Sequence, residues 1–517
     1  MNRTKKFLAD GLILALSAVF MRTVGVSWNA YVSNTVGAES MGLLSLVMSV
    51  YGFSVTFACS GVGLGVTRTV SEALGRGDRS EARGALFAAL GYALLFGGVA
   101  SSCVFMGAEF IGTSLLGDIR TVKSIRLLAL SMAPIALCSV FGGYFNAVRR
   151  VYKSALASIF EQFVRMGACI VLFSFLLPKG VEGACIAIVA GGTVAECLSS
   201  AAAGVLCAFD MRRHIKKNEK TRKGIEWRSS VRALTAVSLP IAASTYVRSA
   251  LVTLEHMLIP RALKQNGLSH ASALASYGML GSMVLPLVLY PASLTGAFAS
   301  LLVPELAQAK ARGERGHISR AANKAIFVTF SFAAVVAGVM ISYSGPLGRV
   351  VYGSTEAGKY IRLLAPIIPI MYLDTVIDSM LKGLGYQVYT MTVNIIDAAF
   401  SVVGVLILIP RFGILGYVIL ISVSELINAS ASYYKLSEVS DVENSVVKVI
   451  FLPTVSAILS CFAVKILYTK LFYLSPENTL GLCVHIISVI MIYAILCGSV
   501  HIRKLNLFPR VKKQAVR

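Results

Sequence analysis

Eleven ionisable side chains fall inside long apolar stretches of this sequence. A charge at the centre of a membrane-spanning helix costs about 2.5–3.5 kcal/mol on insertion scales, so each of these side chains needs a physical reason. Guanidinium groups offer permanently charged, paired donors to phosphate oxygens, and buried carboxylates can take up a proton or a cation. The eleven are Arg22, Glu161, Arg165, Glu196, Arg248, Glu255, Asp374, Asp378, Asp397, Glu425 and Lys465.

Spacing separates some of these residues into pairs. Glu161 and Arg165 are four residues apart on one helix face, where they can neutralise each other. An internal structural pair and a role in substrate binding are equally open for them. Arg248 and Glu255 are seven residues apart and share a face of another predicted helix.

The remaining carboxylates are candidates for ion coupling or gating. Asp374 and Asp378 stack at a spacing of four, and two carboxylates on one face repel unless a proton or a cation lies between them. One interpretation is a coupling site for H⁺ or Na⁺, and the other is a packed pair bridged to Lys382 or a basic loop. Asp397, Glu196 and Glu425 could be polar packing groups or groups that change partners during transport. With Glu161 and Arg165, they complete the ion-coupling and gating set.

About fourteen predicted membrane-spanning helices position these residues. The sequence is 56% hydrophobic, and the apolar stretches are each long enough to cross a bilayer, which predicts an all-α, polytopic membrane protein. The predicted spans are 8–29, 41–65, 84–107, 124–147, 153–177, 183–208, 233–258, 273–302, 325–343, 360–381, 388–409, 413–433, 449–468 and 479–502.

Basic residues alternate between loops in a way that predicts the orientation. Nine Lys or Arg lie between Arg212 and Arg232 and five between Lys310 and Lys324, whereas the loop 30–40 has none. Loops rich in Lys and Arg face the cytoplasm, so both termini are expected on the cytoplasmic side of the membrane. Anionic membrane lipids then account for the net charge of +23, and no nucleic-acid partner is expected.

The two halves of the chain contain similar sequence segments in the same order. VSEALGRGD from Val70 resembles VPELAQAKARGE from Val303, and APIALCSVF from Ala133 resembles APIIPIMYL from Ala365. Six spans per copy predict two parallel bundles. The expected domains are an N-lobe at 1–208, a basic linker at 209–232, a C-lobe at 233–433, and two further spans with a basic tail at 434–517.

Several stretches resemble the multidrug/oligosaccharidyl-lipid/polysaccharide (MOP) exporter superfamily, within it the stage V sporulation protein B branch. They are MRTVGVSWNAYVSNTVGAESMGLLSLVMSVYGF from Met21, GLGVTRTVSEALGRGD from Gly63, ALASIFEQFVR from Ala155, PLVLYPASLTGAFASLLVPELAQA from Pro286 and ILIPRFGILGY from Ile407. The resemblance covers nearly the whole chain. It implies a MATE-like, two-lobed flippase of the bacterial plasma membrane. Such a flippase turns an isoprenoid-pyrophosphate-linked glycan, such as lipid II, to the outer leaflet by alternating access.

The resemblance also implies where the pyrophosphate binds. Arg22 matches the first of the cavity arginines of the lipid II flippase relatives, but a second arginine expected about six residues later is missing. Arg22 and Arg248 are the first candidates, because the first helix of each lobe faces the cavity, and Glu255 and Arg68 join them. No arginine precedes Arg68 in the second span, which favours the sporulation-type branch.

Other functions are less well supported by the residues. A cation-coupled multidrug antiporter would need an acidic residue deep in the first span. The acidic residue of that span is Asp10, which lies at its cytoplasmic edge. A membrane enzyme would need a sizeable loop with clustered acids or histidines, and no phosphate-cradling loop for ATP is present. We therefore expect a transporter that is not an enzyme, acts as a monomer, and uses no cofactor, metal site or ATP.

Overall fold

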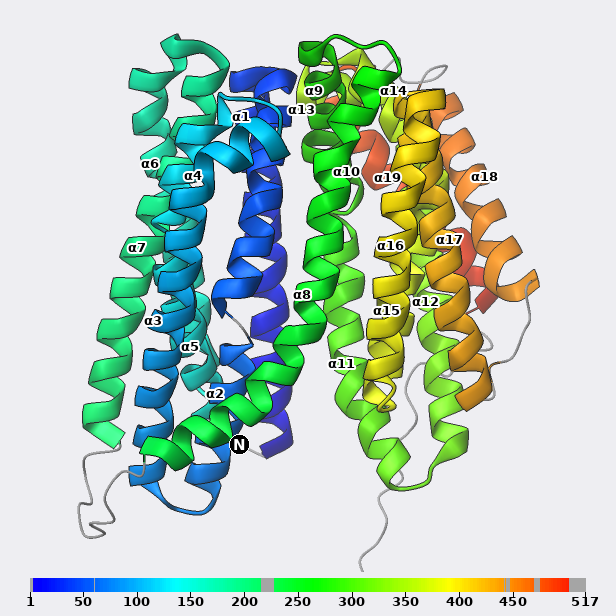
Figure 1. Cartoon of the computed structure of the whole chain (residues 1–517). Coiled ribbons are helices and arrows are strands. Elements are labelled where there is room, and N and C mark those ends of the chain that lie inside the picture. The colour runs from blue at the N-terminus through cyan, green and yellow to red at the C-terminus, as the bar shows by residue number, and fades with distance from the viewer. Residues whose placement is uncertain are drawn as a thin grey trace, which may run out of the picture. The chain divides into compact units, whose positions relative to one another are not determined.

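The computed structural model describes residues 3–59, 61–214, 227–440, 442, 447–468 and 475–501. These residues form helices joined by turns, without a β-strand (Figure 1). Most of the predicted basic linker (215–226) and of the basic C-terminal tail (502–517) lies outside the described residues. Packing divides the chain into a first unit, Met1–Met283 with Asn394–Leu420, and a second unit, Val284–Val393 with Ile421–Arg517. The sequence-based lobe boundaries stay a prediction.

The helices follow one another closely along the chain. Those up to the middle are α1 (Arg3–Cys59), α2 (Val62–Gly75), α3 (Arg79–Phe110), α4 (Thr121–Ala129), α5 (Met132–Ala147), α6 (Val151–Leu176), α7 (Gly180–His214), α8 (Trp227–Gln265) and α9 (His270–Gly278). The later ones are α10 (Leu285–Val288), α11 (Ala292–Ala311), α12 (Arg315–Ser342), α13 (Ser344–Tyr352), α14 (Thr355–Leu364), α15 (Ile368–Gly383), α16 (Gln387–Phe412), α17 (Ile414–Val439), α18 (Leu452–Ile466) and α19 (Thr479–His501).

The predicted all-α, polytopic membrane fold is confirmed. Among the described residues, 10 helical segments are long and apolar enough to cross a membrane, or 11 if α4 and α5, which meet at a bend of 43°, form one span. Two of these segments, Phe20–Gly75 and Tyr152–Met211, each run through stretches that the hydropathy pattern divides into two spans. The number fourteen therefore stays a prediction.

A glycine turn divides α1. Gly37 has φ 80° and ψ 168°, a backbone conformation that glycine adopts without steric cost. The helix runs away from the N-terminus to this residue and then returns (Figure 1). Thus the first two predicted spans are joined by a single non-helical residue rather than by a loop.

Small residues bring helices of the first unit together. A Cβ on Gly42 of α1 would lie 1.9 Å from the carbonyl oxygen of Leu274 in α9, so these two backbones touch directly. A Cβ on Gly191 of α7 would lie 2.4 Å from Cys169 Sγ in α6. Close backbone approach at small residues is the usual way that membrane helices pack, because lipid supplies no hydrophobic force between them.

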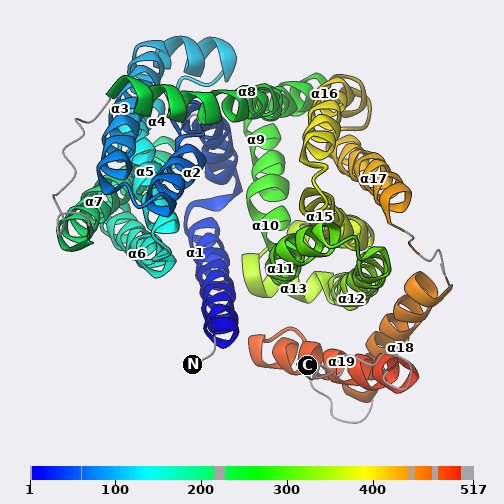
Figure 2. The same ribbon diagram turned by 90° about the horizontal axis from the view of Figure 1, so that it is seen from below.

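The second unit repeats one packing arrangement of the first. In the first unit α5 packs against α2 and α3, and in the second unit α15 packs against α11 and α12 (Figure 2). Leu306, Ile377 and Met380 are buried in the core of this second group. A helix break precedes both α5 and α15, next to the matching Ala-Pro-Ile sequences at Ala133 and Ala365. The layout of the internal repeat as a whole stays a prediction.

Candidate functional site

Arg165 lies at the centre of a charged network in the first unit. Its guanidinium is 2.5 Å from Glu161 Oε1 on the same helix, and 3.8 Å from Glu196 Oε1 on α7. The i,i+4 spacing places Glu161 and Arg165 on one face of α6, as the sequence suggests. With all three groups ionised, two carboxylates and one guanidinium leave a formal charge of −1. A proton or a cation would neutralise that charge.

Glu196 ties this network to α1. Glu196 is only 5% exposed, and its Oε1 accepts a hydrogen bond of 2.5 Å from the hydroxyl of Tyr51. The hydroxyl of Ser131, at the break between α4 and α5, also hydrogen-bonds the carboxylate. A buried carboxylate that contacts α1, α6 and the α4–α5 break responds to movement of any of them.

Glu255 and Asp397 form a second acidic site in the first unit. Glu255 is on α8 and Asp397 is on α16, and they lie close enough for their charges to repel each other. The hydroxyl of Tyr277 lies 2.9 Å from Nδ1 of His256, the residue after Glu255. The sequence suggests substrate binding for Glu255 and gating for Asp397, and in the structure the two charges are near enough to influence each other.

Arg22 and Arg248 are exposed, on α1 and α8. Within the described part of the chain, neither forms an ion pair. Ser249, next to Arg248, donates a hydrogen bond of 3.3 Å to Thr56 on the returning half of α1. The chain thus exposes two guanidinium groups on two apolar helices that pack against each other.

The helical rise places the two arginines at similar depths. Gly37 lies 15 residues after Arg22, and Thr56 lies 19 residues after Gly37. At 1.5 Å per residue, Arg22 is roughly 22 Å from the bend at Gly37 along the helix axis. Thr56, which contacts the residue after Arg248, is roughly 28 Å from the same bend. Arg68 differs, because its Nε is 2.8 Å from Glu72 Oε1 in an exposed i,i+4 pair on α2.

The carboxylates of the second unit have polar neighbours. Asp378 on α15 is buried, accepts a hydrogen bond of 3.1 Å from Ser432 on α17, and lies 3.7 Å from Lys382 Nζ. This contact corresponds to the packed alternative for the Asp374–Asp378 pair. Asp374 is half-buried one turn earlier, and Glu425 is half-buried on α17.

A further charged cluster in the first unit was missed by sequence reasoning. Asp118 lies in the connection before α4, and its Oδ2 is 2.7 Å from Arg120 Nη2 and 2.8 Å from His270 Nε2. Arg120 Nη1 is also 2.9 Å from Glu39 Oε1 on α1. Burial opposes ionisation of Asp118 and is the largest single effect on its pKa, but hydrogen bonds from Arg120 and His270 together lower that pKa. The only signal in the sequence was a group of loop charges.

Two family models match the chain. The model of the polysaccharide biosynthesis protein family matches residues 7–310, which is more than half of the chain. The MatE family model matches residues 262–407.

Relatives and solved structures agree with these matches. Stage V sporulation protein B of Bacillus subtilis (strain 168) is 23% identical over 79% of this chain and 79% of its own length. Lipid II flippase MurJ of the same organism is 23% identical over 77% of each chain. A solved structure of lipid II flippase MurJ, in an inward closed conformation, has a TM-score of 0.70 and 15% identity, and the match covers 95% of this chain and 99% of that one.

A second solved structure represents the multidrug branch. An inward-facing MATE family transporter of the MOP superfamily has a TM-score of 0.64 and 15% identity, covering 83% of this chain and 98% of that one. Likenesses at this identity show the fold. Together with the family match, they show that the chain belongs to the polysaccharide biosynthesis protein family, in the stage V sporulation protein B-like branch of the MOP superfamily of flippases and transporters.

Proposed function

We propose that this protein is a flippase for an isoprenoid-pyrophosphate-linked glycan of the lipid II class, which it moves from the inner to the outer leaflet. The proposal rests on the similarity to stage V sporulation protein B and to lipid II flippase MurJ, and on one structural observation. Arg22 and Arg248 are exposed guanidinium groups on adjacent apolar helices, without an ion pair among the described residues. A charge in that environment is costly unless a ligand neutralises it, and a pyrophosphate offers the matching oxygens.

The remaining parts of the proposal come from the loop charges and from the family resemblance. Both termini lie in the cytoplasm, the protein acts as a monomer, and alternating access moves the headgroup across the bilayer. Membrane lipids surround the helices, and the glycan headgroup enters from the cytoplasmic side. The carboxylates of Glu196, Glu255 and Asp397 supply sites at which H⁺ or Na⁺ can couple to the movement.

The second candidate is a cation-coupled multidrug antiporter. The MatE match and the acidic pair of Glu255 with Asp397 favour it, since organic cations require an acidic cavity. The exposed arginines oppose it, because they repel a cationic drug. The two candidates therefore differ in the sign of the charge that they expect on the ligand.

Leaflet translocation in proteoliposomes tests the proposal. Fluorescent lipid II is incorporated, and the wild-type protein is compared with Arg22→Ala, Arg248→Ala and a control, Arg320→Ala, which removes an exposed arginine of α12. We expect the wild type and Arg320→Ala to flip lipid II and each of the other variants to lose at least about tenfold in rate, which corresponds to one charge-assisted hydrogen bond. Folding of each variant is checked by its unfolding midpoint.

The antiporter would give a different pattern. Wild-type vesicles would then leave lipid II in place and export a cationic dye when an H⁺ or Na⁺ gradient is imposed. In that case the arginine variants would transport the dye as well as the wild type does, and the flippase proposal would be abandoned.

A further inference from the structure

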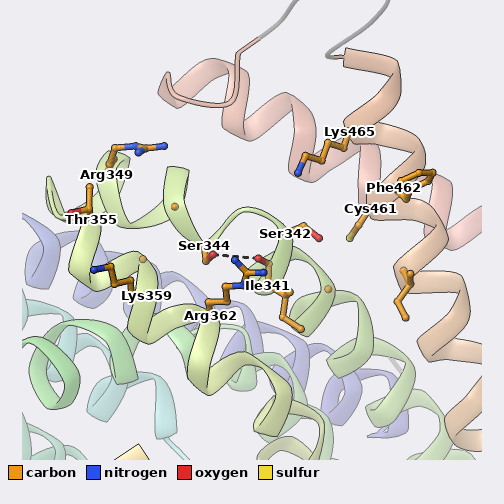
Figure 3. A pocket seen from close by; sticks show the side chains of 14 residues that line it. Ile341, Ser342, Ser344, Arg349, Thr355, Lys359, Arg362, Cys461, Phe462 and Lys465 are labelled. Carbon is orange, nitrogen blue, oxygen red and sulfur yellow. Dashed lines mark hydrogen bonds between the residues drawn. The ribbon is translucent and has the colours of Figure 1, made fainter. Parts of the chain in front are cut away.

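A cavity of about 650 Å³ opens within the second unit, between the end of α12, the short helices α13 and α14, and the end of α18 (Figure 3). Pockets of this size hold small ligands or lipid headgroups. α12 begins within the basic segment Lys310–Lys324, which is predicted to be cytoplasmic, and the cavity lies at the opposite end of this helix. The cavity therefore lies at the predicted outer face of the membrane.

Four basic side chains line the cavity, and none of its described lining residues is a carboxylate. They are Arg349 from α13, Lys359 and Arg362 from α14, and Lys465 from α18. Figure 3 shows Lys465 extending from α18 toward the ends of α12 and α13, and Arg362 beside Ser344. Arg349 forms an ion pair with Glu477 outside the cavity. The lining thus keeps a strong positive charge.

Three basic residues elsewhere on the predicted outer side have partners of their own. Arg120 pairs with Asp118 and Glu39, Lys123 pairs with Glu182, and Arg261 donates hydrogen bonds to backbone carbonyl groups of Ser114 and Leu115. Across the described residues, Lys359, Arg362 and Lys465 form no such ion pair. Because outer loops are generally poor in basic residues, the convergence of these side chains from different helices requires an explanation.

Glycines and apolar side chains shape the rest of the cavity. A Cβ on Gly345 would have only Arg349 Nη2, at 3.7 Å, in its neighbourhood, so this glycine faces open space. Ile458 and Phe462 of α18 line the same cavity and are 61% and 63% exposed. On an apolar helix such side chains face lipid. A ligand that fits this lining has an anionic head and an apolar chain.

We propose that this cavity binds the phosphate headgroup of an anionic lipid in the outer leaflet. Arg362, Lys359 and Lys465 donate to the phosphate oxygens, and the acyl chains lie along Ile458 and Phe462. A free phosphate shares the first interaction and lacks the second. The inference does not depend on which glycan the protein carries.

Lipid binding to the purified full-length protein tests this assignment. Native mass spectrometry of the protein in detergent measures the apparent affinity for phosphatidylglycerol and for phosphatidylcholine with the same acyl chains. The variants are Arg362→Gln combined with Lys465→Gln, and Gly345→Leu, which fills the cavity and keeps every charge. The control is Lys179→Gln, which removes an exposed basic group of the first unit. Inorganic pyrophosphate is the competitor.

We expect the wild type to bind phosphatidylglycerol at least about tenfold more tightly than phosphatidylcholine, because the choline ammonium of phosphatidylcholine is repelled by the basic lining. The double variant and Gly345→Leu should each lose that preference, and Lys179→Gln should keep it. If the double variant fails to fold, Gly345→Leu decides alone. Unchanged preference in Gly345→Leu would overturn the proposal. Displacement of the lipid by an equal concentration of pyrophosphate would also overturn it and indicate a site for soluble anions.

Discussion

His270 Nε2 lies 2.8 Å from Asp118 Oδ2, although the two residues are 152 positions apart in the sequence. Asp118 also forms an ion pair with Arg120, and the guanidinium of Arg120 forms a second ion pair with Glu39. This cluster joins α1, the start of α4 and the start of α9 within the first unit. The side chain of Asp118 is only 4% exposed, so its charge is compensated almost entirely by protein groups. Movement of these helix ends relative to one another requires that these contacts break.

Asp118→Asn should destabilise the first unit. The substitution keeps the shape of the side chain but removes the charge that compensates Arg120, and loss of one partner of a largely buried pair is costly. We expect the free energy of unfolding in detergent to fall by about 2 kcal/mol. The control is Glu182→Gln, which removes the partner of Lys123, a side chain that is 70% exposed. An exposed pair contributes about 0.5 kcal/mol. Equal losses in the two variants would contradict the assigned role of Asp118.

The same carboxylate predicts a dependence on pH. Because the folded-state pKa of Asp118 is lowered from its ordinary value of 3.8, the ionised form stabilises the fold above that value. The contribution is then lost as the pH falls through the folded-state pKa. Between about pH 6 and about pH 3, the wild type should lose more stability than Asp118→Asn does. Unfolding midpoints across this range measure the difference, and parallel curves would exclude Asp118 as its source.

Gly278→Ala should disturb the contact between α1 and α9. A Cβ at this position would lie 2.3 Å from the backbone nitrogen of Gly42 and 2.4 Å from the carbonyl oxygen of Ala38, so the two helices must separate. Overpacking of this kind costs about 3 kcal/mol. The matched control is Gly167→Ala on α6, where no atom lies within 4 Å, and where the better helix propensity of alanine gains about 0.8–1 kcal/mol. Unfolding midpoints that shift alike in the two variants would contradict the direct backbone contact.

Local contacts were the part of the site that the sequence could predict. Glu161 with Arg165, and Asp378 with Lys382, are each four residues apart on one helix, and the structure has them at 2.5 Å and 3.7 Å. Helical periodicity fixes such neighbours without knowledge of the fold. Hydropathy likewise located the apolar helices, because burial in lipid depends on composition.

Contacts between distant segments could not be predicted in the same way. Tyr51 and Glu196 are separated by 145 positions, and Glu255 and Asp397, whose charges influence each other, lie on two helices that no local pattern connects. The shared face of Arg248 and Glu255 says nothing about which residues they contact on other helices. Hydropathy also could not show that a single residue, Gly37, reverses the chain inside α1, because a glycine turn leaves little change in mean polarity.

Arg165→Gln alone should destabilise the protein more than Arg165→Gln combined with Glu161→Gln. The single substitution changes the formal charge of Glu161, Arg165 and Glu196 from −1 to −2 and leaves two carboxylates without a cation. Arg165→Gln combined with Glu161→Gln restores −1. We expect the single variant to lose about 3 kcal/mol of unfolding free energy and the double variant to recover at least half of it. A double variant no more stable than the single one would show that geometry, and not charge, governs the network.

The Glu255–Asp397 pair should determine how transport responds to an ion gradient. Two nearby carboxylates in apolar surroundings repel each other when both are ionised, and a proton or a cation relieves that repulsion. In Glu255→Gln the repulsion is absent at every stage, so the ion no longer favours one conformation over another. Lipid II translocation by this variant should therefore proceed at the same rate with and without an imposed H⁺ or Na⁺ gradient, whereas the wild type should respond to one of them.

Glu305→Gln, which alters an exposed carboxylate beside His317, is the control and should keep the wild-type response. A gradient response that survives in Glu255→Gln and in Asp397→Asn would place the coupling elsewhere, and the Glu161–Arg165–Glu196 network would then be the next site to test.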